Sequence, residues 1–465
     1  MKRFRWLVIL LALGLIAVSC GRSDKNNNNN ASGTTTTAAA GGASSKCKSE
    51  ALKDTDVGVT ASDITIQVMA DVGSPLAPGL FQGNVDAINA YAKYWNAHGG
   101  IGCRQVKVVT WDSKLNAEES KNGLINACAN ALAMVGDNSL FNPDVSAMSD
   151  CKDKAGATTG VPDIAALAND IHEMCAPTLY TVQGISYPCP IQTGVQDIRE
   201  MVGVLSYYTH TLFKDTPLHG LYMVPGDLPT TVQSSTGLIA AQLKAGLTLD
   251  DTLKVSGRDA QAAYTPRVQS MKQHNSNYLY DGSNDRAMIN IRKEAKAQGV
   301  DQQVKLWACS LACYTKAFAQ SGGADVEGTY AWMQYLPFEE ASANKEASLY
   351  VDNVGADKVD SFGAQAWQSA VLFKQVVDEI VSTQGPNAIT RANILKGLAS
   401  TKDFTANGWA GKKDLKGFGP CFLIIKFTGG KWTRVYPTKV GTFDCTDSNV
   451  IKVTLDPVAE AAKIK

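Results

Sequence analysis

The sequence lacks the short motifs that mark most catalytic sites. It contains no GxSxG, HExxH or Walker A pattern, and no GxGxxG follows its first predicted strand. No CxxC pair is present, and the five histidines are too scattered for a zinc site, which needs clustered ligands. We therefore expect no enzyme activity, no metal and no cofactor. The alternative, a metal site, would use the only close grouping of ligand types, His172, Glu173 and Cys175.

An excess of one charge is missing as well. The chain has 44 lysines and arginines against 44 aspartates and glutamates, so its formal net charge is zero. Such a balance offers no basic surface for nucleic acid and no signal of a strongly anionic partner. Apolar residues make up 45% of the 465 residues, which is typical of a globular chain long enough for two domains with full cores.

The first residues predict export and a lipid anchor. Three basic residues precede an apolar segment, Trp6–Val18, which is too short to span a bilayer but fits a secretory signal. The four residues ending at Cys20 resemble a lipobox. We expect residues 1–20 to be a signal peptide and Cys20 to be lipidated at the outer face of the cell membrane. The alternative is an ordinary secretory signal that happens to contain a cysteine. A low-complexity stretch follows, and we expect a disordered tether over residues 21–60.

Eleven cysteines in an exported chain predict disulfides. With Cys20 set aside, ten remain, an even number that allows five pairs. Spacing favours three of them: Cys175–Cys189, Cys309–Cys313 and Cys421–Cys445. We also expect Cys103–Cys128, because both residues fall on the rim away from the predicted ligand site. Cys47 and Cys151 are then paired by elimination.

The stretch Ile64–Asp112 predicts the unit on which the rest of the chain is built. It opens with an apolar, β-branched strand, and a loop rich in proline and glycine, Gly73–Gly83, follows. Apolar residues then recur at helical spacing up to Gly99, and a second strand ends at Asp112. Two strands joined by such a helix form a right-handed βαβ unit. Ligands bind beyond the carboxyl ends of such strands, where Gly73–Gly83 lies.

The same stretch resembles the opening of the branched-chain amino-acid-type periplasmic binding proteins, the substrate-binding components of ABC importers. The resemblance rests on the first strand, GSPLAPG, the amphipathic helix, NAHGGIGCR and the strand ending in Asp112, and it continues more weakly to about residue 447. It implies an α/β fold of two doubly wound, Rossmann-like lobes joined by a three-strand hinge (periplasmic binding protein type I). It also implies a monomer that carries a small solute to an ABC permease and its ATPase.

Strands and helices alternate along the chain, as in doubly wound domains. We expect the first lobe to comprise residues 61–182 and 329–417, and the second to comprise 183–328 with a return over 418–447. Residues 448–465 are expected to be a tail. Two of the predicted helices cover residues 143–154 and 192–211, and a β-hairpin is predicted with Gly429-Gly430 at its tip.

The candidate site is a cleft lined by carboxyl-end loops of both lobes. The resemblance implies that first-lobe hydroxyls and amides hold a carboxylate, and that a second-lobe acid holds an ammonium. The family's acidic position corresponds to Ala287 here, so Asp281 or Asp285 would have to replace it. The alternative role of these polar residues is helix capping or turn formation. The predicted ligand-binding residues are Ser74, Pro75, Leu76, Asn138, Ser139, Leu140, Ala166, Leu167, Asn169, Asp227, Leu228, Asp281, Ser283, Asp285 and Trp332.

The sequence thus predicts a solute-binding lipoprotein that delivers a small polar or amino-acid-like solute to an ABC permease. The alternatives are a ligand-sensing lipoprotein of the same fold without transport, and a secreted enzyme. We expect the first-lobe loops to bind a polar head group, while Trp332 and Tyr335 cover an apolar body. Binding should close the lobes about the hinge.

Overall fold

The computed structural model describes residues 47, 50–76 and 78–465, which fall in one compact unit over residues 38–465. The predicted signal peptide, the lipidation site at Cys20 and the start of the tether lie outside the described residues. In the part of the chain that is described, no helix combines the length and apolar character needed to cross a membrane.

The first lobe is organised around a parallel five-stranded sheet in the order β2-β1-β3-β4-β5. β1 has a neighbour on each side, and its Ile64, Ile66 and Val68 are buried. Apolar and polar residues alternate in its sequence up to Val68, yet the polar Gln67 is buried as well, and its amide donates a hydrogen bond to the carbonyl oxygen of Gly123 at 2.8 Å. The strands are β1 Asp63–Ala70, β2 Gln105–Asp112, β3 Ala133–Val135, β4 Asp163–Ala165 and β5 Leu179–Thr181.

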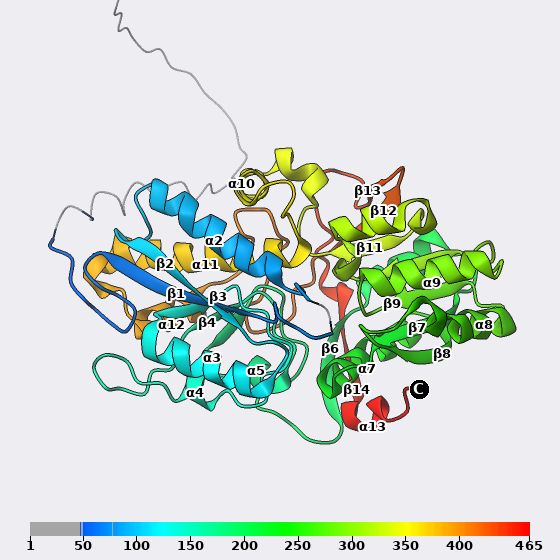
Figure 1. Cartoon of the computed structure of the whole chain (residues 1–465), viewed down its shortest axis with the longest axis horizontal. Helices are drawn as coiled ribbons and strands as arrows, with labels where there is room; N and C mark the ends of the chain where they lie inside the picture. The colour runs from blue at the N-terminus through cyan, green and yellow to red at the C-terminus, as the bar shows by residue number, and fades with distance from the viewer. Residues whose placement is uncertain (1–46, 48–49, 77) are drawn as a thin grey trace, which may run out of the picture. The chain divides into compact units, whose positions relative to one another are not determined.

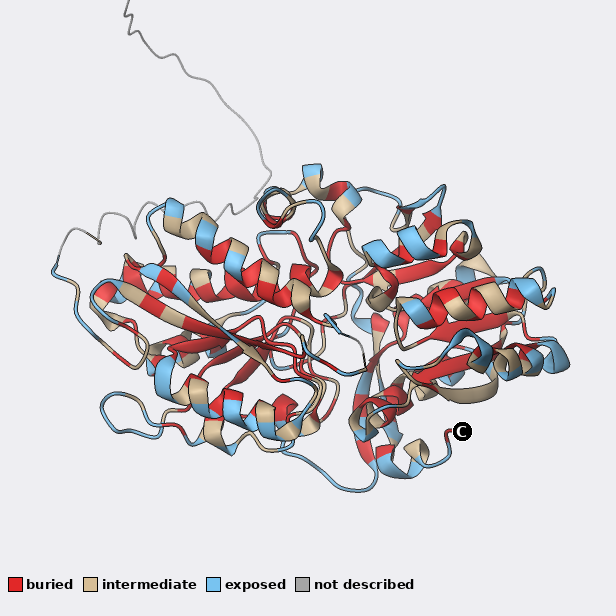
Figure 2. Cartoon of the chain, viewed as in Figure 1, coloured by how far each residue is buried: buried red, intermediate tan, exposed pale blue. Residues whose placement is uncertain are grey.

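Helices cover both faces of this sheet (Figure 1). α2 packs on α11 over one face, while α3 contacts β1 and β2 from the other. Figure 2 shows that the sheet and the helix surfaces turned towards it are largely buried. The carboxylate of Asp360 caps α11 by accepting hydrogen bonds from the N–H groups of Phe362 and Gly363. The helices are α2 Gln82–Ala97, α3 Ala117–Asn130, α4 Ser146–Ser149, α5 Ile171–Met174, α10 Lys345–Val354, α11 Ser361–Gln384 and α12 Arg391–Ser400.

The second lobe contains a seven-stranded sheet in the order β13-β12-β11-β10-β9-β7-β8. Five of its strands are parallel, and the hairpin of β12 and β13 adds two antiparallel strands at one edge. The predicted hairpin tip, Gly429-Gly430, has positive φ at both glycines. The strands are β7 His219–Pro225, β8 Thr248–Val255, β9 Tyr278–Asp281, β10 Leu306–Cys309, β11 Tyr330–Met333, β12 Leu423–Thr428 and β13 Lys431–Tyr436. The helices are α6 Gly203–Tyr207, α7 Pro229–Lys244, α8 Thr265–His274, α9 Asp285–Ala297 and α13 Pro457–Ala461.

Two elements near the lobe junction differ from the predictions. The helix expected over residues 192–211 is wrong in its centre, where β6 Gln196–Met201 pairs antiparallel with β14 Val450–Leu455. The expected tail therefore contributes a strand. Asp197 and Thr454, which face each other in this pair, are 257 residues apart in sequence, so local periodicity could not reveal the pairing. The helix expected over 143–154 is shortened to the four residues of α4.

The chain passes between the two lobes three times: after β5, after β11 and before β12. Because β11 lies in the second sheet, the second lobe extends somewhat beyond the predicted boundary at residue 328. The predicted α/β fold of two doubly wound lobes is confirmed.

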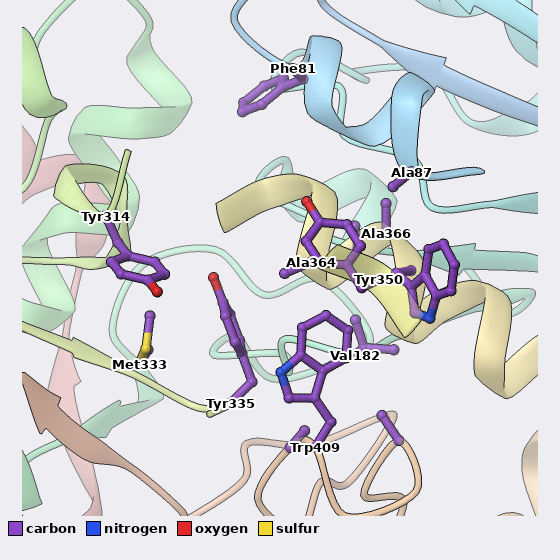
Figure 3. Packing of buried hydrophobic residues seen from close by; sticks show 14 of the residues in the cluster. Phe81, Ala87, Val182, Tyr314, Met333, Tyr335, Tyr350, Ala364, Ala366 and Trp409 are labelled. Carbon is purple, nitrogen blue, oxygen red and sulfur yellow. The ribbon is translucent and has the colours of Figure 1, made fainter. Parts of the chain in front are cut away.

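The second crossing is packed by aromatic rings (Figure 3). Tyr335 is fully buried beside Trp409, and its hydroxyl donates to the carbonyl oxygen of Ser361 at 2.9 Å. The indole of Trp409 donates to the carbonyl of Leu336 at 3.0 Å. Tyr335 is thus part of the core, and the expectation that it covers a ligand is wrong.

Five disulfides join cysteines of the described residues, and three are those predicted: Cys175–Cys189, Cys309–Cys313 and Cys421–Cys445. The other two predictions are wrong, because Cys103 is bonded to Cys47 and Cys128 to Cys151. The three confirmed pairs are close in sequence. The two disulfides that were predicted wrongly depend on how distant segments lie on the first lobe. The spacing of cysteines in the sequence does not indicate this arrangement.

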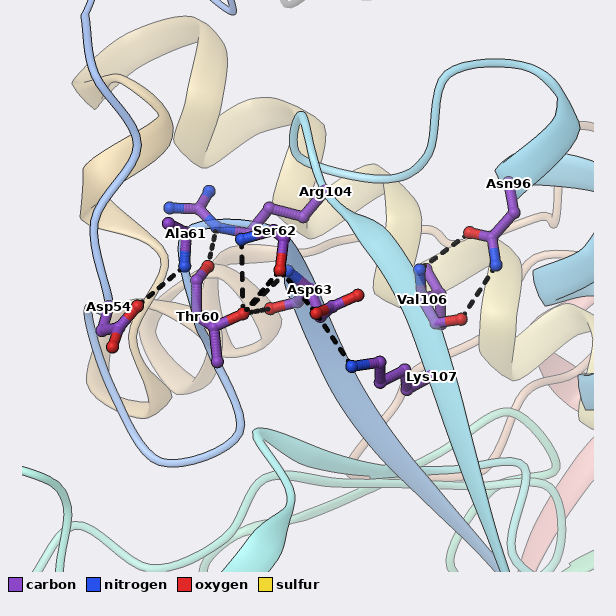
Figure 4. Close-up of polar contacts among 9 residues, drawn as sticks. All are labelled: Asp54, Thr60, Ala61, Ser62, Asp63, Asn96, Arg104, Val106 and Lys107. Carbon is purple, nitrogen blue, oxygen red and sulfur yellow. Dashed lines mark hydrogen bonds and ion pairs between the residues drawn. The ribbon is translucent and has the colours of Figure 1, made fainter.

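Residues 50–60 pack on the first lobe (Figure 4). Arg104 is only 1% exposed, and its guanidinium donates to the carbonyl oxygens of Thr60 at 2.7 Å and Lys53 at 3.0 Å. Asp54 accepts a hydrogen bond from the N–H of Ala61 at 2.8 Å. The predicted tether is therefore wrong for residues 50–60. Hydrogen bonds between side chains and backbone hold this segment in place. Such bonds require no apolar periodicity, so the sequence gives little indication of them.

Candidate functional site

A cavity of about 910 Å³ is lined by both lobes. Its volume lies in the range of small-molecule sites, roughly 300–1,000 Å³. The lining residues follow the carboxyl ends of β1, β3 and β4 in the first lobe and of β7, β9 and β10 in the second. This is the edge at which open α/β sheets bind their ligands.

The structure brings nine of the fifteen predicted ligand-binding residues to this cavity and leaves six outside its lining. The nine are Leu76, Leu140, Leu167, Asn169, Asp227, Leu228, Ser283, Asp285 and Trp332. The six are Ser74, Pro75, Asn138, Ser139, Ala166 and Asp281.

The polar groups of the first-lobe loops are turned away from the cavity, towards Asp71 at the end of β1. One carboxylate oxygen of this fully buried residue accepts hydrogen bonds from the Ser113 hydroxyl at 2.6 Å and the Leu115 N–H at 2.7 Å. The other accepts from the N–H of Leu140 at 2.8 Å. Burial raises the pKa of Asp71, and these hydrogen bonds oppose that shift. Ser139 is also fully buried, with its hydroxyl 3.1 Å from that of Ser120.

With those polar groups turned inward, the first-lobe wall is mainly apolar. Phe81 and Phe362 both belong to it, with their ring centroids 4.9 Å apart in an edge-to-face contact. The amides of Asn169 and Gln183 are among the polar groups of the lining. The apolar first-lobe lining consists of Leu76, Pro78, Leu80, Phe81, Leu115, Leu140, Leu167, Val359 and Phe362.

The second-lobe wall is rich in polar and aromatic groups. Tyr222 and Tyr280 stack with ring centroids 5.3 Å apart and an interplanar angle of 4°. The indole N–H of Trp332 donates to the Tyr280 hydroxyl at 2.9 Å. Asp227 accepts hydrogen bonds from the Ser256 hydroxyl and the Gly257 N–H at 2.6 and 2.7 Å. The hydroxyl groups of the lining thus belong to the second lobe, while Ser74 and Ser139 of the first lobe lie outside it.

Neither acidic residue proposed for an ammonium group is well placed for it. Asp281 is fully buried outside the cavity lining and accepts a hydrogen bond from the Ser283 N–H at 2.8 Å. Burial raises the pKa of Asp281 to about 8. Asp285 does line the cavity, but it bonds to the N–H of Arg286 and the hydroxyl of Thr315.

Sequence reasoning missed four of the carboxyls that line the cavity: Asp86, Asp357, Asp360 and, the buried one among them, Glu200. Glu200 lies on β6, lines the cavity and is 8% exposed. Burial raises its pKa to about 8. In the structure Gln196, Ile198 and Glu200 are buried and alternate with exposed neighbours. Because Gln196 and Glu200 are polar, the sequence contains no apolar alternation that would have indicated this strand.

The potential metal ligands near the site are already bonded. Asp281, Cys309 and Cys313 offer ligand atoms within 4.8 Å of one another, but the two sulfurs form a disulfide. In the alternative grouping, Cys175 is bonded to Cys189, and the ring of His172 lies 2.9 Å from Asp170. In neither grouping do the described cysteines provide a thiolate for a metal.

Comparison with known proteins identifies relatives of this arrangement. A model of the periplasmic binding protein family matches residues 63–417. Three solved structures illustrate the similarity. The branched-chain amino acid transporter substrate-binding protein LivJ from Streptococcus pneumoniae, in complex with isoleucine, is 18% identical over 81% of this chain and 100% of its own, with a TM-score of 0.57. A fatty acid ABC transporter substrate-binding protein from Thermomonospora curvata is 18% identical over 83% and 97%, with a TM-score of 0.60.

The third is a solute-binding protein of an ABC transporter from R. palustris, in complex with benzoate. It is 14% identical over 82% of this chain and 99% of its own, with a TM-score of 0.58. At these identities the similarity to solved structures concerns the fold. Comparison with curated protein sequences gives no match.

Proposed function

This chain belongs to the periplasmic binding protein family, and from that premise we propose that it is an exported lipoprotein that captures a small solute and delivers it to an ABC permease. The observation that carries the proposal is the 910 Å³ cavity, to which both lobes contribute lining residues. The similar folds in complex with isoleucine and benzoate, and the one named for fatty acid transport, support a carrier of small organic solutes. No chemical change of the solute is part of this proposal.

The mechanism follows from the way the lobes are connected. Three chain crossings join them, so the lobes can rotate as bodies about these connections. A solute that contacts the first-lobe leucines and the second-lobe aromatic rings together favours the closed arrangement by its differential affinity for it. The permease would then recognise the closed, loaded form.

Identification of the bound compound tests solute capture. We expect mass spectrometry of the purified protein to reveal a small organic molecule, and calorimetry with that molecule to give one site per chain. X-ray scattering should show a smaller radius of gyration with the compound than without it. An unchanged radius would contradict closure, and conversion of the compound into a product would favour an enzyme.

Transport requires a test in cells. We expect deletion of the gene to abolish import of the identified compound, while a variant that binds but cannot close restores little import. Normal import accompanied by loss of a response to the compound would instead indicate a ligand sensor.

The lipid anchor is tested at Cys20. We expect Cys20→Ala to move the protein from the membrane fraction to the soluble extracytoplasmic fraction, because no acyl chains would be attached. A Ser19→Ala variant is the matched control and should remain with the membrane. Retention of the Cys20→Ala protein in the membrane fraction would contradict lipidation.

A further inference from the structure

We propose that Glu200 makes the cavity a receptor for organic cations, solutes in which a protonated amine is attached to a partly apolar body. This inference rests on the proposed solute-binding function and names the chemical class of its solute. It departs from the amino-acid arrangement implied by the family resemblance, in which the acidic position corresponds to Ala287.

Glu200 is a buried cavity carboxyl that is available to bind a ligand. Its side chain shares a face of β6 with the buried Ile198, is more than nine-tenths buried and lines the cavity. Among the described residues no side chain or backbone group forms a hydrogen bond or ion pair with it. A buried carboxyl without a partner is costly, so in most proteins it is paired or hydrogen-bonded.

Helix α7 leaves room for this carboxyl. A Cβ atom added at Gly237 would lie 2.2 Å from Oε1 of Glu200, so only a glycine fits there without displacing the side chain. Glycine in the middle of a helix is destabilising by about 1 kcal/mol relative to alanine. Gly237 therefore allows the observed position of the carboxyl, although it lowers the stability of the helix.

Within the described part of the chain, no cation offsets Glu200. The three basic residues that line the cavity are exposed and are engaged elsewhere: Arg286 with the carbonyl of Gly257, Lys316 with that of Ala356, and Lys358 with Asp86. Burial is the cause of the raised pKa of Glu200, with no opposing charge. At neutral pH the empty cavity therefore holds Glu200 mainly protonated, and an ammonium group would bind the ionised form.

The groups around Glu200 suit an ammonium. Tyr222 on β7 and Tyr280 on β9 line the cavity together with Glu200; burial raises the pKa of both tyrosines, and the charge of Glu200 adds to this shift. Tyr187 is the third titratable group that responds to this charge, and α7 contributes the hydroxyl of Ser235 beside Tyr222. From β14, Ile451 pairs with Glu200 and is uncharged. Aromatic rings and a carboxyl together stabilise a bound cation.

The rest of the cavity agrees with a cationic solute that has an apolar body. Six carboxyl groups line it, against three basic groups, and Glu200 is the buried one among the six. The first lobe contributes three of these six carboxyls and also five leucines, which can cover hydrocarbon. A solute whose charged group is a carboxylate would find no buried basic group in the lining.

Three probes of matched size test the inference: 4-phenylbutylamine, 4-phenylbutanol and 4-phenylbutyrate. We expect calorimetry to show the amine binding at least about tenfold more tightly than the alcohol, as a charge-assisted hydrogen bond implies. Binding at pH 7 should release close to one proton, measured in buffers of different ionisation enthalpy, because the pKa of Glu200 falls when the ammonium binds. The butyrate should bind most weakly.

Two variants locate the effect. Glu200→Gln keeps the shape of the side chain and should lose at least about tenfold in amine affinity, with no proton release and unchanged alcohol binding. Asp197→Asn removes a charge from the exposed face of the same strand and should behave as wild type. Circular dichroism and melting of each variant establish that it is folded. As a second route, Gly237→Ala should weaken amine binding without changing the charge of the protein.

The outcomes separate this inference from the proposed function. Equal affinity for amine and alcohol, preference for the butyrate, or wild-type amine binding by Glu200→Gln would overturn it. If the compound that co-purifies is an anion that compacts the protein, solute capture stands and the cation inference fails. If neither the probes nor any co-purified compound binds, both fail.

Discussion

The two walls of the cavity are built in opposite ways. In the first lobe, the carboxylate of Asp71 holds the loop backbones and draws polar groups away from the solute, so leucine side chains face the cavity. In the second lobe, aromatic rings and the buried carboxyl of Glu200 face it. The difference teaches that a loop rich in polar residues is not necessarily a polar surface. Its polar groups satisfy buried backbone first, because an unpartnered buried group is destabilising.

Asp71→Ala should disrupt the first-lobe wall of the cavity, and we expect it to have the largest effect of the substitutions considered. It would leave the hydroxyl of Ser113 and the N–H groups of Leu115 and Leu140 without their acceptor, and we expect a loss of about 2–5 kcal/mol in the free energy of unfolding. Denaturant unfolding measures it. Asp112→Ala is the control, since that less buried carboxylate accepts from two N–H groups, those of Gly73 and Lys114. Equal stability of the two variants would contradict a special role of Asp71.

Glu200→Gln should change the pH dependence that the second wall confers. The pKa of Glu200 is raised above its unfolded value, to about 8, so the folded state retains this proton where the unfolded state has lost it. The contribution of Glu200 to the free energy of unfolding is therefore fully present at pH values below the pKa of the unfolded state. It declines as the pH rises towards 8. Between pH 5 and pH 9 we expect the free energy of unfolding of the variant to rise, relative to that of wild type, by up to about 3 kcal/mol.

The difference between the two proteins, measured by unfolding at pH 5, 7 and 9, is the relevant quantity. Wild type alone would not suffice, because Asp163 and Asp281 also have pKa values raised by burial, to about 7 and about 8. A difference that stays constant across this range would show that Glu200 is ionised in the empty cavity.

Trp332→Ala should weaken the second wall without unfolding the protein. The substitution removes an aromatic surface from the cavity and the hydrogen bond to the Tyr280 hydroxyl. We expect solute affinity to fall by about 1–3 kcal/mol. Calorimetry with the co-purified compound measures the loss, and Trp332→Phe should retain part of the affinity. Unchanged affinity in both variants would remove Trp332 from the site.

Ser139→Ala should have the smallest effect on binding. The hydroxyl lies outside the cavity lining and contacts Ser120, so we expect affinity close to wild type and a loss of about 0.5–1.5 kcal/mol in stability. Calorimetric titration with the co-purified compound measures the affinity, and denaturant unfolding measures the stability. A tenfold loss of affinity with unchanged stability would restore the direct ligand contact first expected from the sequence.

Much of the secondary structure was predictable because its signals are local. The β12–β13 hairpin has the predicted Gly429-Gly430 at its tip, α2 ends at Ala97 just before the predicted Gly99, and β2 ends at the predicted Asp112. Apolar periodicity, turn glycines and capping residues act within one or two turns of chain, so they can be read without a partner. The three disulfides between near neighbours in sequence belong to the same class.

The sequence by itself determined the alternation of strands and helices, the two-lobed α/β fold and the edge of the sheets at which a cavity forms. Only the tertiary structure decided which side chains face that cavity. Glu200 reaches it because β6 pairs with β14 from the far end of the chain, and Ser139 is hidden because the nearby loops turn towards Asp71. Both outcomes depend on hydrogen bonds between residues distant in sequence. Such bonds form because buried polar groups need partners, and a local pattern does not indicate where those partners lie.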